Sequence, residues 1–188
     1  MHMPDLLRRW TREQVLALPE DGSRYELLDG ELLVTPSPAG IHQRAVLKLY
    51  DRIAPYVRDH KLGALAISPA DLDFGSGQLL QPDLFVGRIF QGREPIHWPE
   101  FGIPLLIAEV LSPSTALSDR NRKRRKYQDA GVAEYWIVDL DARLIERWRP
   151  GEDRPEILTE RIEWQPDRAV EPLEVDLVDY FREVWGES

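Results

Sequence analysis

The spacing of apolar positions along the chain predicts alternating helices and strands. Between Ile41 and Arg58, apolar residues recur every three or four positions, which is the pattern of a helix with one side facing a core. Residues 64–68, 79–86, 105–111 and 133–139 form short apolar runs of the kind found in buried strands. Because the two patterns alternate, we expect an α/β fold with a central mixed β-sheet flanked by helices.

Two signals organise the N-terminal part of the chain. Thr11 and Gln14 have the spacing of a capping box, so a short helix is expected to begin there. Asp29 and Gly30 lie between two apolar-rich runs and predict a two-residue hairpin turn. The N-terminal part should therefore add a helix and a β-hairpin to the central sheet.

Turn residues and caps delimit the middle of the chain. Gly75 to Gly77 predicts a turn into the next strand, and residues 87–104 lack a clear periodicity and predict a long loop. Ser118 or Asp119 can cap a further helix, and Gly131 is a typical residue for its end.

The C-terminal part predicts a hairpin and a last helix. Apolar and polar residues alternate in 144–148 and 156–164, as in a hairpin with one solvated face, and 177–185 predicts a short helix. No internal repeat or linker divides the sequence. Residues 1–188 are therefore expected to form a single domain.

Composition narrows the class of protein. The chain has no cysteine, which excludes disulfides and thiolate metal sites and fits a reducing compartment. No apolar stretch approaches the roughly 18 residues of a membrane span, and Met1–Asp5 lacks the features of a secretion signal, so we expect a soluble cytoplasmic protein. With 24 Lys and Arg against 33 Asp and Glu, the formal net charge of -9 argues against a protein that coats nucleic acid. A local basic site is still compatible with this total.

The apolar run 105–111 contains one carboxylate, Glu109. An ionised carboxylate among residues that prefer a dry interior is costly unless a cation or several donors compensate it. Glu109 could belong to a functional site, or it could form a structural ion pair with an arginine. Because the surrounding run is so apolar, the functional site is favoured. Glu109 is therefore the first candidate for chemistry.

Two further residues can share a site with Glu109. Asp83 follows a proline at the entry of another buried strand, and if the two strands are neighbours both carboxylates point at the same space. Hard oxygen ligands of this kind suit Mg²⁺ or Mn²⁺ rather than zinc. Lys123 lies on the following helix, four positions before Tyr127, so both are expected to face the sheet. Taken alone, Asp83 is more often a turn residue, and Lys123 is as often a solvated charge as a site residue.

The same helix carries six basic residues between positions 120 and 126. Arg120, Arg122 and Arg124 are expected to face outward and to bind phosphate groups, with an exposed charged helix face as the alternative. Next to two carboxylates and a lysine, such a patch points to phosphodiester hydrolysis. The carboxylates would hold a metal ion that activates water, and the lysine would stabilise charge on the phosphate.

These residues resemble the PD-(D/E)XK signature of restriction-endonuclease-like nucleases. Pro82-Asp83 and Glu109-Val110-Leu111 match it, except that Leu111 stands where the signature lysine is expected. Lys123 resembles a migrated replacement. A closer resemblance, over nearly the whole chain, is to the Uma-type restriction endonuclease family. The specific features are Tyr25–Leu32, His42, Asp83, Glu109–Thr115, Asp119, Lys123, Tyr127 and Gly131–Asp139.

The resemblance implies a restriction-endonuclease-like core with Asp83, Glu109 and Lys123 as catalytic residues. Mg²⁺ or Mn²⁺ would be held by the two carboxylates and the Val110 carbonyl. DNA is the expected substrate, contacted by the three arginines, Tyr127 and His42, with Glu31 and Ser112 as supporting residues. Glu26 is the other hairpin residue that could supply a carboxylate, and either glutamate could equally be an exposed strand residue. A homodimer is expected, because nucleases that cut both strands often pair two sites.

Two other functions stay open at this point. A nuclease-fold protein that binds nucleic acid or a protein partner without cutting would carry the same residues. A hydrolase using Ser112 or Ser114 with His42 is less well supported, because no nucleophile-elbow pattern surrounds either serine.

Overall fold

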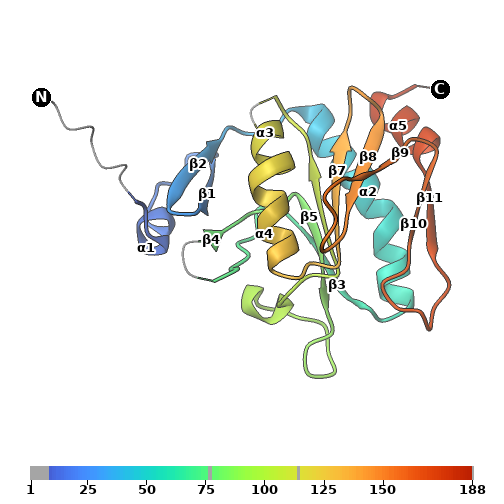
Figure 1. The fold of residues 1–188 in the computed structure, drawn as a ribbon, viewed down its shortest axis with the longest axis horizontal. Coiled ribbons are helices and arrows are strands. Elements are labelled where there is room, and N and C mark those ends of the chain that lie inside the picture. Colours follow the sequence, from blue (N-terminus) through green and yellow to red (C-terminus); the bar gives the residue numbers. More distant parts are fainter. Residues whose placement is uncertain (1–8, 76–77, 114, 188) are drawn as a thin grey trace, which may run out of the picture.

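The computed structural model describes residues 9–75, 78–113 and 115–187 and contains a six-stranded central sheet (Figure 1). Strands β6 and β7 are parallel, and the other neighbours are antiparallel. The predicted central mixed sheet is confirmed. In spatial order its strands are β3 (Gly63–Ile67), β5 (Leu84–Arg88), β6 (Leu106–Val110), β7 (Glu134–Asp139), β8 (Leu144–Trp148) and β9 (Glu156–Leu158). Met1–Asp5, Ser76, Gly77 and Ser114, which entered the sequence predictions, lie outside the described residues.

Helices cover both faces of this sheet (Figure 1). Helices α2 (Gly40–Asp59) and α5 (Leu177–Trp185) contribute buried residues to a cluster on one face. Helix α4 (Arg124–Asp129) packs on the other face through Tyr127. The predicted helical layers on both faces are therefore present.

The alternation of side chains along β6 decides which face Glu109 meets. Leu106, Ala108 and Val110 belong to the cluster packed on α2, whereas Ile107 belongs to the cluster on the α4 face. Since successive side chains of a strand point to opposite faces, Glu109 shares the α4 face with Ile107.

The N-terminal hairpin forms at the end of the molecule away from α5 (Figure 1). Strands β1 (Arg24–Leu28), β2 (Glu31–Thr35) and β4 (Gln78–Leu79) make a second sheet in the order β2-β1-β4. Asp29 and Gly30 have φ angles of 56° and 83°, as a tight two-residue hairpin turn requires. The predicted hairpin is confirmed.

Helix α1 (Arg12–Leu16) begins with the predicted capping box. The Gln14 amide donates to Thr11 Oγ1 over 3.4 Å, and the Thr11 amide donates to Gln14 Oε1 over 3.0 Å. Together these bonds satisfy two amide groups that would otherwise have no partner within the helix.

The basic helix begins earlier than the sequence predicts. It starts with α3 (Ala116–Ser118), continues through the π-helical segment η2 (Asp119–Lys123) and leads directly into α4. Ser118 and Asp119 therefore lie inside the helical segment, and the predicted cap at either residue is wrong. The Asp119 carboxylate is buried instead, 3.5 Å from Lys123 Nζ.

The predicted C-terminal hairpin is correct only in its first part. Strand β8 pairs with β9, but β10 (Arg161–Trp164) pairs with β11 (Leu173–Asp176) in a separate two-stranded sheet. Ile162 and Trp164 are buried in the cluster on the α2 face. Strand β10 therefore packs against the α2 face of the core and does not extend the edge of the main sheet.

The long loop after β5 contains a short 3₁₀ helix, η1 (Trp98–Phe101), and the predicted last helix is present as α5. In the part of the chain that the structure describes, no helix has the length and apolar character needed to cross a membrane.

Gly63 offers a test of the contact between β3 and β5. A Cβ at this position would lie 1.8 Å from the Gly87 carbonyl oxygen, which belongs to the backbone of the paired strand. We expect Gly63→Ala to lower the free energy of unfolding by about 1–3 kcal/mol, because the strands must move apart. Urea unfolding measures the change.

Gly40→Ala is the matched control, since no atom lies within 4 Å of a Cβ built at Gly40, in the first turn of α2. Its stability should stay within about 1 kcal/mol of the parent protein. Equal effects of the two substitutions would contradict the proposed clash.

Candidate active site

Strands β5 and β6 bring Asp83 next to Glu109. In their antiparallel register Leu84 lies opposite Ala108, so Asp83, one residue before β5, lies opposite Glu109. The Asp83 amide donates to Glu109 Oε2 over 3.3 Å, and the Val110 amide donates to Asp83 Oδ2 over 2.8 Å. Strands β5 and β6 are therefore neighbours, as a site shared by Asp83 and Glu109 requires.

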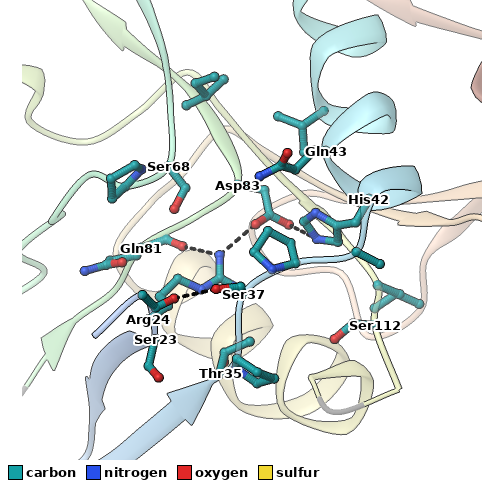
Figure 2. Close-up of a pocket in the computed structure, with 18 of the residues that line it drawn as sticks. Ser23, Arg24, Thr35, Ser37, His42, Gln43, Ser68, Gln81, Asp83 and Ser112 are labelled. Atoms are coloured by element: carbon teal, nitrogen blue, oxygen red, sulfur yellow. Dashed lines mark hydrogen bonds and ion pairs between the residues drawn. The ribbon is translucent and has the colours of Figure 1, made fainter. Parts of the chain in front are cut away.

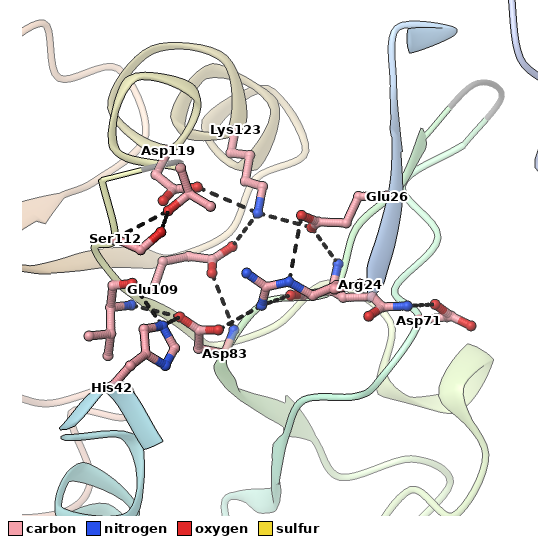
Figure 3. Close-up of polar contacts among 12 residues, drawn as sticks. Arg24, Glu26, His42, Asp71, Asp83, Glu109, Ser112, Asp119 and Lys123 are labelled. Atoms are coloured by element: carbon pink, nitrogen blue, oxygen red, sulfur yellow. Dashed lines mark hydrogen bonds and ion pairs between the residues drawn. The ribbon is translucent and has the colours of Figure 1, made fainter. Parts of the chain in front are cut away.

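Lys123 reaches Glu109 from the helix on the same face. Its Nζ lies 3.0 Å from Glu109 Oε1, 2.9 Å from Glu26 Oε1 and 3.5 Å from Asp119 Oδ1 (Figure 3). The Tyr127 hydroxyl donates to the same Glu109 oxygen over 3.2 Å. Lys123 and Tyr127 are both buried and point inward, as their four-residue spacing predicts.

Arg24 and Glu26 of β1 complete this group, and no local sequence signal points to Arg24. Arg24 Nη1 donates to Asp83 Oδ1 over 2.7 Å and to the Gln81 carbonyl over 3.0 Å. Glu26 Oε1 accepts the Gln81 amide over 2.8 Å. Because Arg24 and Glu26 are two positions apart on a strand, both side chains leave it on the same face.

This buried cluster holds more acid than base. Four carboxylates face two cations, so two negative charges are uncompensated when all six groups are ionised. The members are Glu26, Asp83, Glu109, Asp119, Arg24 and Lys123. We refer to these six residues as the charge cluster.

Burial and the neighbouring charges shift the pKa of Glu109, Asp119 and Lys123. Burial raises the pKa of Glu109 well above its usual value, against the effect of Lys123, and the nearby acids raise it further. Burial likewise raises the pKa of Asp119. Burial would lower the pKa of Lys123, but the surrounding carboxylates outweigh it and raise that pKa. The charge cluster therefore favours the charged form of Lys123 and the neutral form of Glu109.

Asp83 behaves differently because donors surround it. Burial would raise its pKa, but a hydrogen bond from His42 and the charge of Arg24 outweigh burial and lower the pKa to about 2. His42 Nε2 lies 3.1 Å from Asp83 Oδ2 and 3.0 Å from the Val110 carbonyl oxygen. Asp83 is therefore an anion at neutral pH.

A cleft of about 1370 Å³ opens beside Asp83 (Figure 2). Arg24, His42 and Asp83 line it, together with the hairpin, α1 and the first turn of α2. Glu109 lies behind Asp83, outside this lining. Lys123 borders a separate cavity of about 160 Å³. A molecule in the cleft would therefore meet Asp83 and His42 before the rest of the charge cluster.

Glu31 and Tyr127 do not occupy the positions expected of them. Glu31 is 62% exposed at its side chain and forms an ion pair with Arg122 at 2.8 Å, so Glu26 supplies the hairpin carboxylate of the cluster. Tyr127 is fully buried, and its hydroxyl donates to Glu109 Oε1. Ser112 lines the cleft, and its Oγ lies 3.0 Å from Thr115 Oγ1.

The arginines of the basic segment have protein partners. Arg120 forms ion pairs with Asp139 at 2.7 Å and Glu146 at 2.6 Å, and it also lines the cleft. Arg122 pairs with a hairpin carboxylate, and Arg124 lies over a tryptophan ring, 4.4 Å from its centroid. Phosphate binding by these arginines would compete with contacts that the fold already makes.

The raised pKa of Glu109 predicts a pH dependence of stability. A carboxyl group whose pKa is higher in the folded than in the unfolded protein binds its proton more tightly when folded, so stability falls as pH rises above the unfolded value. In metal-free protein, Glu109→Gln removes this loss. The difference in unfolding free energy, variant minus parent, should therefore become more positive between pH 5 and pH 8 in urea titrations with EDTA.

Glu31→Gln is the control for this effect, because Glu31 is exposed and lies outside the charge cluster. The difference in unfolding free energy between Glu31→Gln and the parent should not become more positive between pH 5 and pH 8. If the difference in unfolding free energy between Glu109→Gln and the parent is the same at pH 5 and pH 8, the raised pKa of Glu109 is contradicted.

The sequence and the fold are similar to those of known proteins. The sequence profile of the Uma2 family, described as "Putative restriction endonuclease", matches residues 12–181. A solved structure titled as a putative nuclease belonging to DUF820, from Anabaena variabilis, is similar with a TM-score of 0.73 at 18% identity, over 93% of this chain and 98% of that chain. No curated protein matches. The structural likeness confirms the predicted nuclease-type fold, and because the family profile spans most of the sequence, this chain belongs to the Uma2 family.

Proposed function

We propose that this protein is a metal-dependent endonuclease that hydrolyses phosphodiester bonds of DNA. Asp83, Glu109 and the Val110 carbonyl would bind Mg²⁺ or Mn²⁺, and Lys123 would act as the cationic catalyst. Membership of a family described as restriction endonucleases supports a nuclease, and families with restriction-endonuclease-like folds generally use divalent metals.

The observation that carries this proposal is the charge imbalance of the cluster. Four buried carboxylates face only two cations, and the excess of two negative charges equals the charge of one divalent ion. Buried charge without compensation is costly, so the excess is relieved either by protons on the carboxyl groups whose pKa is raised, Glu109 and Asp119, or by a bound divalent ion. The imbalance lies beside a cleft that is open to a substrate.

The donor atoms fit a hard divalent ion. Carboxylate and carbonyl oxygens are the ligands that Mg²⁺ and Mn²⁺ prefer. Among the described residues no three Asp, Glu or His side chains are arranged as a ready metal site. Glu109 Oε1 is turned toward Lys123 and Tyr127, so the backbone oxygen of Val110 is needed to complete the set.

Each residue has a distinct part in this scheme. When bound, the ion would polarise the phosphate and lower the pKa of a water molecule. Arg24 holds Asp83 Oδ1, which fixes the orientation of the carboxylate beside the cleft. Tyr127 and Lys123 hold Glu109 Oε1, and Lys123 would supply positive charge as negative charge develops on the phosphate.

The second candidate is a nuclease-fold protein that binds nucleic acid or a protein partner without cutting. The ion pairs of Arg120 and Arg122 favour the binding of a protein partner, because carboxylates already occupy these arginines and would compete with phosphate groups. We further propose that residues 1–188 act as one domain and that the protein works in the cytoplasm as a homodimer. The lack of cysteine supports the compartment, and the need to cut two DNA strands supports the dimer.

Plasmid nicking tests the proposal. The purified protein should nick supercoiled DNA with Mg²⁺ or Mn²⁺ and lose this activity in EDTA. Asp83→Asn and Glu109→Gln should each reduce the nicking rate at least about 100-fold, because each removes a charged ligand.

Glu31→Gln should nick like the parent protein, since Glu31 lies outside the charge cluster. Nicking that survives in EDTA or in Glu109→Gln would sink the assignment. Metal binding in calorimetry without any nicking would favour the non-cutting candidate.

A further inference from the structure

The residues proposed to act on the substrate are recessed from the surface. The exposed fraction is 3% for Asp83 and 1% for both Glu109 and Lys123. Asp83 lies between Arg24 and His42 at the cleft (Figure 2). A phosphate group must therefore enter the cleft to meet Asp83.

From the size, charge and lining of this cleft we infer that it takes an unpaired strand of DNA rather than a duplex, and that a base of this strand stacks on Trp185. The inference rests on the proposed function, because it concerns the substrate of the same site. It is compatible with the proposed homodimer, in which each subunit would take one of two separated strands.

The volume of the cleft suits a few nucleotides. Pockets that enclose a drug-sized ligand measure about 300–1000 Å³, and the cleft, at about 1370 Å³, is only a little larger. A duplex is much larger than this, since its major groove alone is about 12 Å wide. A single strand is narrow and flexible, so it can bring a phosphate group to Asp83 without the rest of a double helix.

The lining of the cleft is acidic. Among the described residues that line it, five have carboxylates and two are arginines. Both arginines already pair with a carboxylate, Arg24 with Asp83 at 2.7 Å and Arg120 with Asp139 at 2.7 Å. A duplex carries one negative charge per about 1.7 Å of its length and a single strand one per about 3.4 Å, so the acidic lining repels a duplex more strongly. The five carboxylates belong to Glu20, Asp71, Asp83, Asp139 and Asp141.

Exposed apolar side chains also line the cleft. Leu16, Leu47 and Trp185 are 53%, 51% and 40% exposed, respectively. The indole of Trp185 is held through its Nε1, which donates to the Leu140 carbonyl oxygen over 3.3 Å. The bases of a duplex present only their edges in the grooves, whereas an unpaired base can stack on an aromatic ring. Trp185 therefore offers a stacking position that suits a separated strand.

Binding without cutting tests the inference directly. In EDTA, fluorescence anisotropy of the full-length protein compares a labelled DNA strand of about 12 nucleotides, a length typical of single-strand sites, with the duplex formed from it. The strand should bind at least about tenfold more tightly than the duplex. Equal or tighter binding of the duplex overturns the inference.

Substitution of Trp185 tests the stacking position. Trp185→Ala should weaken binding of the strand at least about fivefold, the loss expected for one stacked base, and Trp185→Phe should keep most of the affinity. Trp98→Ala is the matched control, because Trp98 is 41% exposed but does not line the cleft. It should bind the strand like the parent protein. If Trp185→Ala also binds the strand like the parent, the inference is overturned.

Cutting separates this inference from the proposed function. With Mg²⁺ or Mn²⁺, negatively supercoiled plasmid should be nicked faster than relaxed closed plasmid, because negative supercoiling favours local strand separation. If both plasmids are nicked at the same rate, the inference fails and the proposed function stands. If the protein prefers the strand in binding but cuts neither DNA, the inference stands for binding and the proposed cutting fails. No binding of strand or duplex, with or without Mn²⁺, overturns both.

Discussion

One ammonium group holds three parts of the chain together. Lys123 Nζ forms ion pairs with Glu26 of β1, Glu109 of β6 and Asp119 of its own helical segment. These are buried contacts, and removing one partner of a buried pair leaves the others uncompensated. The placement of the hairpin sheet against the central sheet therefore depends on the same residue that is proposed to act on the phosphate.

The main elements of the site could be predicted because their signals are local. Glu109 is visible as a carboxylate in an apolar run, and the four-residue spacing of Lys123 and Tyr127 gives their direction. The local sequence does not separate Glu26 from Glu31, because each is followed by two leucines. Only the fold shows that Glu26 is buried and Glu31 is exposed.

The other contacts depend on tertiary structure. Arg24 approaches Asp83 only because the hairpin sheet packs at this edge, and the partners of Arg120 come from β7 and β8. A local cap signal at Asp119 was similarly overridden, since its carboxylate gains a buried cation by turning inward. Sequence patterns give the face on which a side chain lies, but not which distant charge it will meet.

The π-helical segment η2 has a consequence for the rotational phase of the helix. A π turn holds more residues than an α turn, so it rotates every later side chain about the helix axis relative to α3. In this chain the rotation ends with Lys123 and Tyr127 both directed at Glu109. The length of η2 therefore determines the direction in which the Lys123 side chain points. In this way the helix after β6 supplies the cation that Leu111, an apolar residue, cannot provide.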